Sequence, residues 1–326
     1  MWEETFLMNY SRQYIEEIGN KTGFINSNIE KVIRLLDVLR FVDSELDQGH
    51  RKLVLKGGTA INLLYFNLPR LSVDIDMDYV GSIDKETAKI DRESIMDSFD
   101  RFMLKDGYVV STKSRNSAIL ASRTYSYVNA FGNKDNIKVE INFIDRTHVL
   151  GTELIGATYF GKRVVSSCPL KEELFGMKIC ALLDRSKPRD LYDVNNIMSM
   201  SENLNSQKLR KSVLFYLSLD GIFFLDDSIY HGMKSITQND IKRELLPVLV
   251  RNDRFNLEQV KEKVSLWLKS LLMVTDDERK YLNEFSYGNF NPFLLFDDID
   301  AKRAFHHPMA KWRALVCKNG KGRTKK

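Results

Sequence analysis

Residues 73–79 alternate apolar and acidic side chains and place an aspartate at every second position from 74 to 78. On a β-strand, residues two apart lie on the same face, so Asp74, Asp76 and Asp78 share one side of the strand. Three carboxylates on one face repel one another and are costly to bury unpaired. The segment therefore predicts a strand with one apolar face and one face that attracts cations.

A divalent cation offsets this repulsion. Oxygen ligands suit Mg²⁺ or Mn²⁺, which keep several waters and take further ligands from substrate phosphates. The three cysteines are scattered and lack C-x-x-C spacing, and the five histidines form no H-E-x-x-H motif. A disulfide framework and a zinc site are therefore not indicated, and any metal chemistry is expected to use carboxylates.

Gly57 and Gly58 follow the apolar run 53–55 and precede a helical pattern that reaches Phe66. Backbone N–H groups at the start of a helix bind anions, and glycine lets a phosphate approach closely. Taken alone, a glycine pair is more often a tight turn and D-x-D more often a solvated strand face. Their occurrence in this order, 16 residues apart, favours a phosphate site beside a metal site.

Glu140 lies in a second β-rich run, 137–145, where Val139 and Ile141 form the apolar side and Glu140 faces the other way. Alone, it is best explained as a solvated residue of an antiparallel strand. If its strand lies beside the aspartate strand, Glu140 completes a three-carboxylate set able to hold two metal ions.

Lys178 lies within an otherwise apolar helix, and Asp190 and Asp193 begin the next one, after Pro188. Asp190 suits the first turn of that helix, where an acid stabilises the helix dipole. A functional cluster and an ordinary ion pair between helices explain this pattern equally well.

The order of elements predicts an α+β fold with a small mixed sheet flanked by helices, followed by a helical domain. We expect a helical segment at 1–50 that packs on the core, a mixed-sheet core at 51–165, a helical domain at 166–315 and a disordered basic tail at 316–326. The N-terminal segment should contain a helix at 24–48, and the sheet domain should contain a helix at 86–105 and a hairpin of 118–130 with 137–145 around a turn at 132–136. Helices of the second domain are expected at 170–184, 190–201, 206–219, 238–246, 256–273, 276–286 and 299–315.

The formal net charge of +5 comes entirely from the tail, because residues 316–326 contain five basic and no acidic residues. The tail is either an auxiliary RNA contact or a solubilising end. No apolar run approaches the ~18 residues of a membrane span, and the mean hydropathy is −0.31. The N-terminus lacks the features of a signal peptide. We therefore expect a cytoplasmic protein that does not bind membranes.

Four motifs in order resemble one known family: K-G-G-T-A at 56–60, R-x-S-x-D-I-D at 70–76, V-E-I-N-F at 139–143, and Lys178 followed by D-L-Y-D at 190–193. The sequence is similar to the AbiEii/AbiGii nucleotidyltransferase toxins, which include the MenT toxins and belong to the DNA polymerase β-like nucleotidyltransferase superfamily. The resemblance is strong over about residues 50–200. The later helices resemble the family in character, and two segments, Asn291-Pro292-Phe293 and His307-Pro308 to Trp312, are similar to segments near the family's C-terminus.

The resemblance implies that residues 51–165 form a nucleotidyltransferase core. It also implies the toxin half of a toxin–antitoxin or abortive phage-infection system, with the antitoxin a separate protein encoded nearby. Such enzymes transfer NMP from an NTP to RNA, and relatives add it to the tRNA 3′ end, which blocks translation.

The resemblance also assigns roles to individual residues. Asp74 and Asp76 correspond to the metal-binding acids, and Glu140 corresponds less securely to a third ligand. The cradle for the triphosphate is Gly57, Gly58 and Thr59, with Arg70 and Ser72 as further nucleotide-binding residues. Lys178 would offset charge on the leaving pyrophosphate, and Asp193 would orient Lys178 or contact the acceptor. No role follows for Asp78.

Two alternatives keep part of this site: an enzyme that nucleotidylates proteins, and a non-catalytic regulatory protein that binds NTP. A metal-dependent nuclease would also use clustered carboxylates but does not need the glycine turn. The choice of NTP, the particular acceptor and the antitoxin's mode of inhibition do not follow from the sequence.

Overall fold

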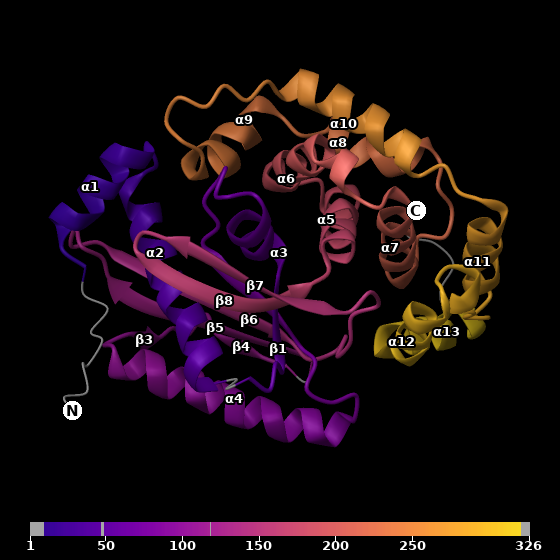
Figure 1. Ribbon diagram of the computed structural model, residues 1–326, viewed down its shortest axis with the longest axis horizontal. Helices are drawn as coiled ribbons and strands as arrows, with labels where there is room; N and C mark the ends of the chain where they lie inside the picture. The colour runs from indigo at the N-terminus through magenta and orange to yellow at the C-terminus, as the bar shows by residue number, and fades with distance from the viewer. Residues whose placement is uncertain (1–9, 47–48, 118, 321–326) are drawn as a thin grey trace. The chain divides into compact units, whose positions relative to one another are not determined.

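The computed structural model describes residues 10–46, 49–117 and 119–320, and the chain divides into two compact units (Figure 1). Each unit is assembled from three separate segments. The first comprises Met1–Ile144, Leu154–Cys168 and Pro247–Asp253. The second comprises Asp145–Glu153, Pro169–Leu246 and Arg254–Lys326.

The first unit is built on a six-stranded mixed sheet with strand order β1-β2-β6-β5-β3, in which β4 also pairs with β5. Strands β2 and β6 are parallel, whereas the other pairs are antiparallel. The strand that carries Glu140 therefore lies directly beside the aspartate strand. The strands are β1 Leu53–Lys56, β2 Asp74–Tyr79, β3 Val109–Val110, β4 Arg115–Asn116, β5 Leu120–Val128 and β6 Lys134–Asn142.

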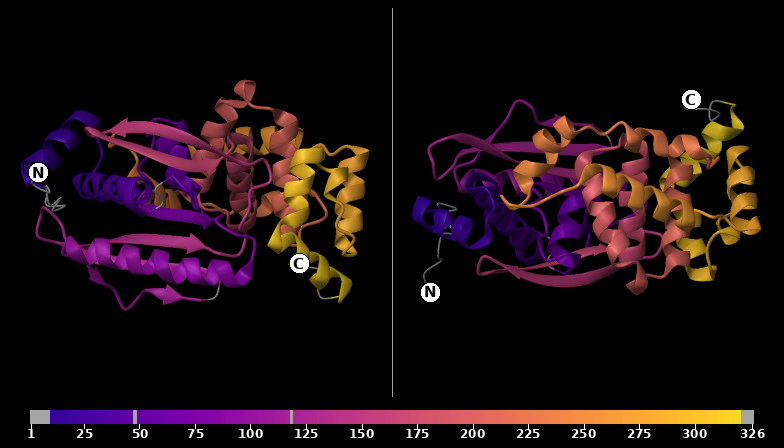
Figure 2. Two further views of the ribbon diagram at one scale, coloured as in Figure 1. Left: turned by 60° about the horizontal axis from the view of Figure 1, so that its bottom comes forward. Right: turned by 90° about the horizontal axis from the view of Figure 1, so that it is seen from above.

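The described part of the first unit also contains four α-helices. They are α1 Arg12–Thr22, α2 Asn26–Phe41, α3 Gly57–Ala60 and α4 Lys85–Lys105. The three- and four-residue spacing of apolar side chains in α2 puts Ile29, Val32 and Ile33 in the core, each 0% exposed. Phe41 of α2 stacks on Phe102 of α4 with ring centroids 3.9 Å apart, so the two helices pack together (Figure 2).

Strands β7 Thr152–Tyr159 and β8 Lys162–Pro169 form a separate two-stranded sheet that the sequence analysis did not predict. Their turn contains Gly161, whose positive φ of 74° suits glycine. Exposed and half-buried residues alternate along β7, so one face of the strand is covered and the other is open to solvent.

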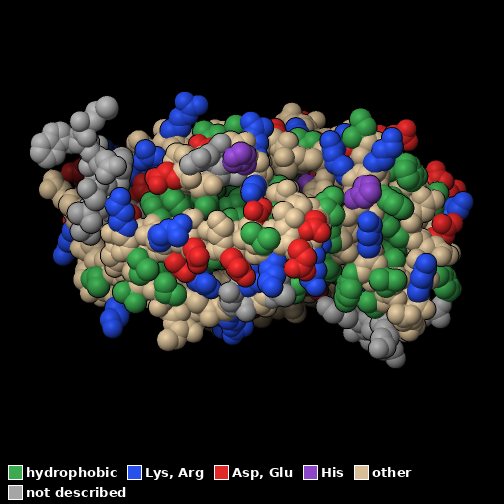
Figure 3. Space-filling model, turned by 90° about the horizontal axis from the view of Figure 1, so that it is seen from below, with side chains coloured by type: hydrophobic (Ala, Val, Ile, Leu, Met, Phe, Trp, Pro, Cys, Tyr) green, Lys and Arg blue, Asp and Glu red, His purple; other side chains and the backbone are tan. Residues whose placement is uncertain are grey.

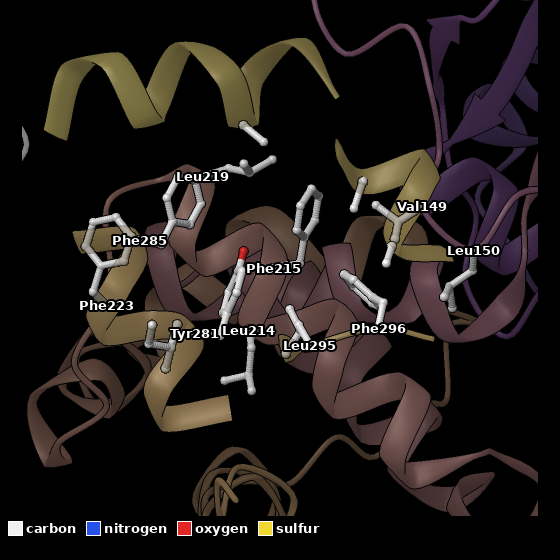
Figure 4. Packing of buried hydrophobic residues seen from close by; sticks show 14 of the residues in the cluster. Val149, Leu150, Leu214, Phe215, Leu219, Phe223, Tyr281, Phe285, Leu295 and Phe296 are labelled. Atoms are coloured by element: carbon white, nitrogen blue, oxygen red, sulfur yellow. The ribbon is translucent and has the colours of Figure 1, made fainter. Parts of the chain in front are cut away.

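The second unit is a helical bundle. Its helices are α5 Lys171–Arg185, α6 Pro188–Ser199, α7 Ser206–Leu219, α8 His231–Lys234, α9 Gln238–Asp240, α10 Leu257–Leu271, α11 Asp276–Ser286, α12 Asp298–His306 and α13 Pro308–Lys318. A capping box begins α11, with Thr275 and Glu278 exchanging side-chain and backbone hydrogen bonds. In the core of this unit, Tyr281 packs against Phe285 and Phe215 against Phe296, with ring centroids 5.7 and 5.8 Å apart (Figure 4).

Several predicted boundaries were wrong for local reasons. The single helix expected at 299–315 is two helices, because the ring of Pro308 disfavours helical backbone at His307, which is extended. The hairpin turn lies at 129–133, where the side chain of Asn129 accepts the N–H groups of Phe131 and Asn133. Residues expected in that turn instead begin β6.

The ends of the chain also differ from expectation. Helix α1 lies within the helical segment expected at 1–50, although it was not predicted as a separate helix, and α2 begins at Asn26 and continues as a π-helical turn, Val42–Leu46. The tail expected to be disordered is helical through Lys318, and its residues 321–326 lie outside the described part of the chain.

Residues 145–153 and 247–253 are each separated in the sequence from the rest of their unit, and hydrogen bonds join each of them to that unit. In the second unit, buried Glu173 accepts the N–H groups of Val149 and Leu150 at 2.8 and 2.7 Å. In the first unit, Val248 accepts the N–H of Leu71 at 2.8 Å. Such bonds satisfy backbone groups that would otherwise be costly to bury. Within the described residues, no helix is long and apolar enough to cross a membrane.

Candidate active site

Four acidic residues meet on one face of the central strands of the first unit, and we call Asp74, Asp76, Asp78 and Glu140 the carboxylate cluster. The parallel register of β2 and β6 sets Asp76 opposite Glu140. The antiparallel register of β1 sets Lys56 opposite Asp76 from the other side. The alternation seen in the sequence thus becomes one acidic patch across neighbouring strands.

The two outer members of the carboxylate cluster are neutralised by lysines. Lys56 Nζ lies 2.5 Å from Asp78 Oδ1, and Asp78 is 0% exposed. Lys138 Nζ lies 2.5 Å from Glu140 Oε2. Asp78, whose role the sequence left open, is therefore the buried half of an ion pair, because a buried carboxylate without a partner would be costly.

Asp74 and Asp76 differ from the outer members. Both are half-buried, and among the described residues neither forms an ion pair nor accepts a side-chain hydrogen bond. Burial and the negative charges of Asp74 and Glu140 raise the pKa of Asp76, and Lys56 and Lys138 offset this only in part. These two carboxylates lack the cation that their neighbours have.

The charges of this patch fit one divalent cation, since four carboxylates and two lysines carry a formal charge of −2. No group of three or more His, Cys, Asp or Glu side chains in the described residues is arranged to hold a metal ion. Mg²⁺ at nucleotide sites commonly takes one or two carboxylates and completes its shell with water and phosphate. The Asp74–Asp76 pair fits that pattern, whereas Glu140 is held by Lys138.

The glycine turn lies against this acidic pair. Gly57 has a positive φ of 68°, and a Cβ there would lie 2.9 Å from Asp76 Oδ2. A Cβ on Gly58 would lie 2.5 Å from Arg70 Nη2. Any larger residue would therefore push on the carboxylate or on the guanidinium, which explains why both positions are glycine.

Buried polar side chains fix the turn to β2. The hydroxyl of Thr59 lies within hydrogen-bonding distance of Ser72 Oγ, at 2.9 Å, and of the carbonyl oxygen of Asp74. Asn62 Nδ2 donates to the carbonyl of Gly58 at 2.8 Å. Thr59, Arg70 and Ser72 are almost fully buried. The structure thus gathers the predicted nucleotide-binding residues around the glycine turn and uses the Thr59 hydroxyl to hold that turn.

Lys178 and Asp193 belong to the second unit, where Lys178 bridges two acids of α6. Its Nζ lies 2.9 Å from Asp190 Oδ1 and 3.1 Å from Asp193 Oδ2. Arg185 Nε also donates to Asp190 Oδ2, at 2.7 Å. Burial alone would raise the pKa of Asp190, but Lys178 and Arg185 lower it to about 2. We call these four residues the lysine cluster.

Sequence reasoning missed the lysine partners of the carboxylate cluster. Lys56 and Lys138 were not singled out, although Lys138 lies two residues before Glu140 on the same strand face. Asp190 was expected either to stabilise the dipole of α6 or to form an ion pair, and it is a main partner of Lys178. Only Lys138 had a local signal, because Lys56 and Lys178 pair with acids that are distant in the sequence.

A family model described as nucleotidyl transferase AbiEii toxin, type IV TA system, matches residues 40–288. The chain belongs to this family. The match spans the carboxylate cluster, the glycine turn and the lysine cluster, and it ends before α12 and α13. AbiEii membership makes the protein a nucleotidyltransferase toxin, for which an NTP is the substrate and an antitoxin is the implied partner.

The fold agrees with this AbiEii assignment. The structure is similar to MenT4, a nucleotidyltransferase toxin from Mycobacterium tuberculosis H37Rv, with a TM-score of 0.63 and 14% sequence identity. The similarity covers 95% of this chain and 99% of MenT4. No curated protein matches the sequence. The expected α+β nucleotidyltransferase fold is therefore confirmed.

Proposed function

We propose that this AbiEii toxin transfers NMP from an NTP to an RNA acceptor, the 3′ end of tRNA, and thereby blocks translation, in phage defence or a related toxin–antitoxin system. The observation that carries the chemistry is the Asp74–Asp76 pair, which lacks a cation and lies against the glycine turn. The choice of tRNA rests on the family resemblance.

Asp74 and Asp76 would hold Mg²⁺, or Mn²⁺ in its place. When bound, the metal ion offsets negative charge on the phosphates and favours ionisation of the attacking hydroxyl. The backbone N–H groups of Gly57 and Gly58, at the start of α3, would bind the triphosphate. Arg70 and Ser72 pack against the glycine turn. We propose that they also contact the nucleotide.

The reaction forms a bond between the acceptor 3′-oxygen and the α-phosphorus and breaks the bond from that phosphorus to the bridging oxygen of pyrophosphate. The hydroxyl proton leaves to solvent, and pyrophosphate departs with its charge. We assign Lys178 to stabilisation of that charge, with Asp190 and Asp193 as the residues that hold its ammonium group in place.

The direct test incubates the purified protein with Mg²⁺, total tRNA and each of the four NTPs labelled at the α-phosphate. Labelled tRNA that loses its label after trimming of the 3′ end is the expected product. The variant Asp74→Asn/Asp76→Asn is the control. Absence of labelled RNA with all four NTPs would contradict the proposal.

Two other functions are separated by the same reaction mixture. Label in polypeptide and not in RNA would identify a protein-nucleotidylating enzyme. Nucleotide binding without pyrophosphate release would identify a non-catalytic regulator. The second alternative is disfavoured because both acids of the Asp74–Asp76 pair are present and positioned on the strand face beside the turn.

Growth arrest provides the cellular test of the toxin. Expression of the wild type should stop growth, and Asp76→Ala and Lys178→Ala should each relieve the arrest. Co-expression of a small regulator encoded next to this gene should also relieve it. If both variants remained as toxic as the wild type, the assignment of these residues would be wrong.

A further inference from the structure

The final segment of the sequence has a charge that sets it apart from the rest of the chain. Residues 301–326 contain nine basic and no acidic residues. This excess is larger than the net charge of +5, so residues 1–300 are acidic on balance. Five of the nine basic residues lie in the described helices α12 and α13: Lys302, Arg303, Lys311, Arg313 and Lys318.

A groove of about 460 Å³ runs between α13 and residues 288–291, and its lining is mainly apolar, with Phe290, Phe305 and Leu315 among the lining residues. Gly288 allows the close packing beneath it. Its φ is 85°, and a Cβ there would lie 2.6 Å from the carbonyl oxygen of Ala314. The close approach of Gly288 to α13 therefore forms the floor of the groove.

Aromatic rings and cations alternate beside the groove. Phe305 and Trp312 are 49% and 50% exposed, which is high for large apolar side chains. Lys311 Nζ lies 5.9 Å from the centroid of the Phe305 ring, and Arg313 Cζ lies 5.0 Å from that of Trp312. Figure 3 shows this part of the surface on the right, where basic and hydrophobic side chains lie next to one another.

The cations of this surface remain available to a ligand. In the chain as described through residue 320, neither Lys311 nor Lys318 forms an ion pair with an acid, whereas Arg303 is paired with Asp300. Half-exposed rings accept stacked bases, and lysines beside them neutralise phosphates. Single-stranded RNA offers both groups at once, whereas paired bases in an A-form duplex are not free to stack on a side chain.

We propose that the C-terminal basic surface, formed by Phe305, Lys311, Trp312, Leu315 and Lys318, binds single-stranded RNA. This deepens the proposed function and rests on it for the choice of RNA as the partner. The surface lies outside residues 40–288, which match the family model.

The test measures binding of the full-length protein, without NTP, to a labelled single-stranded RNA of about 12 nucleotides by fluorescence anisotropy. Trp312→Ala should weaken binding at least fivefold, and Trp312→Phe should restore most of it. Lys311→Glu/Lys318→Glu should also weaken binding and should lower the slope of log K against log salt by about 1.4. The matched controls are Ile90→Ala and Lys89→Glu, on the exposed face of α4, and should leave binding unchanged.

Binding that is equal for wild type and Trp312→Ala, with both proteins folded by circular dichroism, would overturn the proposal. Equal affinity for a duplex of the same length would do so too, as would binding to anionic vesicles or an acidic peptide with none to RNA. Because no NTP is present, the result is independent of catalysis. RNA binding through Trp312 without any nucleotidyl transfer would contradict the proposed function and leave this surface assignment standing.

Discussion

The two charged clusters of this protein have opposite electrostatic character. In the carboxylate cluster, four acids share two lysines, and Asp74 and Asp76 are left half-buried without a cation. In the lysine cluster, Lys178 and Arg185 meet Asp190 and Asp193, and three of the four are almost fully buried. The first cluster needs a cation from outside the chain, whereas the second supplies its own.

The pKa values follow this difference. Burial and like charges raise the pKa of Asp76, whereas Lys178 and Arg185 overcome the effect of burial and lower that of Asp190 to about 2. A raised carboxyl pKa indicates that the fold opposes the charge, and a lowered one that the fold stabilises it. Functional sites commonly contain carboxyl groups with a raised pKa, because a bound ligand can stabilise their charge.

The largest expected effect is on catalysis. Asp74→Asn and Asp76→Asn should each reduce nucleotidyl transfer about a thousandfold, because each removes a ligand charge from a metal worth several kcal/mol in the transition state. The measurement is the initial rate with labelled NTP and saturating RNA at fixed Mg²⁺. Full activity in either variant would contradict the assignment of the carboxylate cluster.

The next effect concerns folding. Lys178→Met should lower the free energy of unfolding by about 3–5 kcal/mol, because it leaves two buried carboxylates without their shared cation. Lys187→Met is the matched control, since Lys187 forms an exposed ion pair with Glu244 at 3.7 Å and should cost under about 1 kcal/mol. Urea unfolding of both variants checks this, and equal losses would show that the lysine cluster contributes no special stability.

A third effect is the pH dependence of stability. The folded pKa of Asp190 lies below its ordinary value of 3.8, so its contribution is present above pH 3.8 and is lost as pH falls through about 2. The loss should be roughly 2 kcal/mol and should be absent in Asp190→Asn. Asp76 has the reverse sign, since its contribution is present at low pH and is lost as pH rises through its raised folded pKa. Unfolding free energies of the wild type, Asp190→Asn and Asp76→Asn, measured as a function of pH, separate the contributions of Asp190 and Asp76.

The smallest effect is stabilisation by metal alone. At a concentration tenfold above its Kd, Mg²⁺ should stabilise the wild type by about 1.4 kcal/mol and should leave Asp74→Asn/Asp76→Asn unchanged. Thermal unfolding with Mg²⁺, with Ca²⁺ and with EDTA measures this. An equal shift in wild type and double variant would place the bound ion outside the carboxylate cluster.

The carboxylate face of β2 could be predicted from the sequence because strand geometry alone sets it. Alternation fixes which side Asp74, Asp76 and Asp78 share, whatever the rest of the fold does. The parallel pairing of β2 with β6 could be stated only as a condition, because it depends on contacts between residues far apart in the sequence.

The lysines that complete the clusters could not be assigned in advance, since many lysines could reach an acid and only the folded register selects Lys56 for Asp78. The β7–β8 sheet was missed because Gly156 interrupts an already weak alternation. The helix break before Pro308 could have been predicted, because proline disfavours helical backbone at the residue before it. The helical pattern on both sides of Pro308 was given more weight.

The return of residues 247–253 to the first unit has a consequence for synthesis on the ribosome. Leu71 and Gly23 are made early, but their partners Val248 and Arg251 emerge only after most of the chain. Because chains fold as they emerge, from the N-terminus, the sheet that carries Asp74 and Asp76 must wait for this late segment before its surroundings are complete. A nascent or truncated chain that stops before residue 247 therefore contains every residue of both charged clusters and still lacks a finished fold.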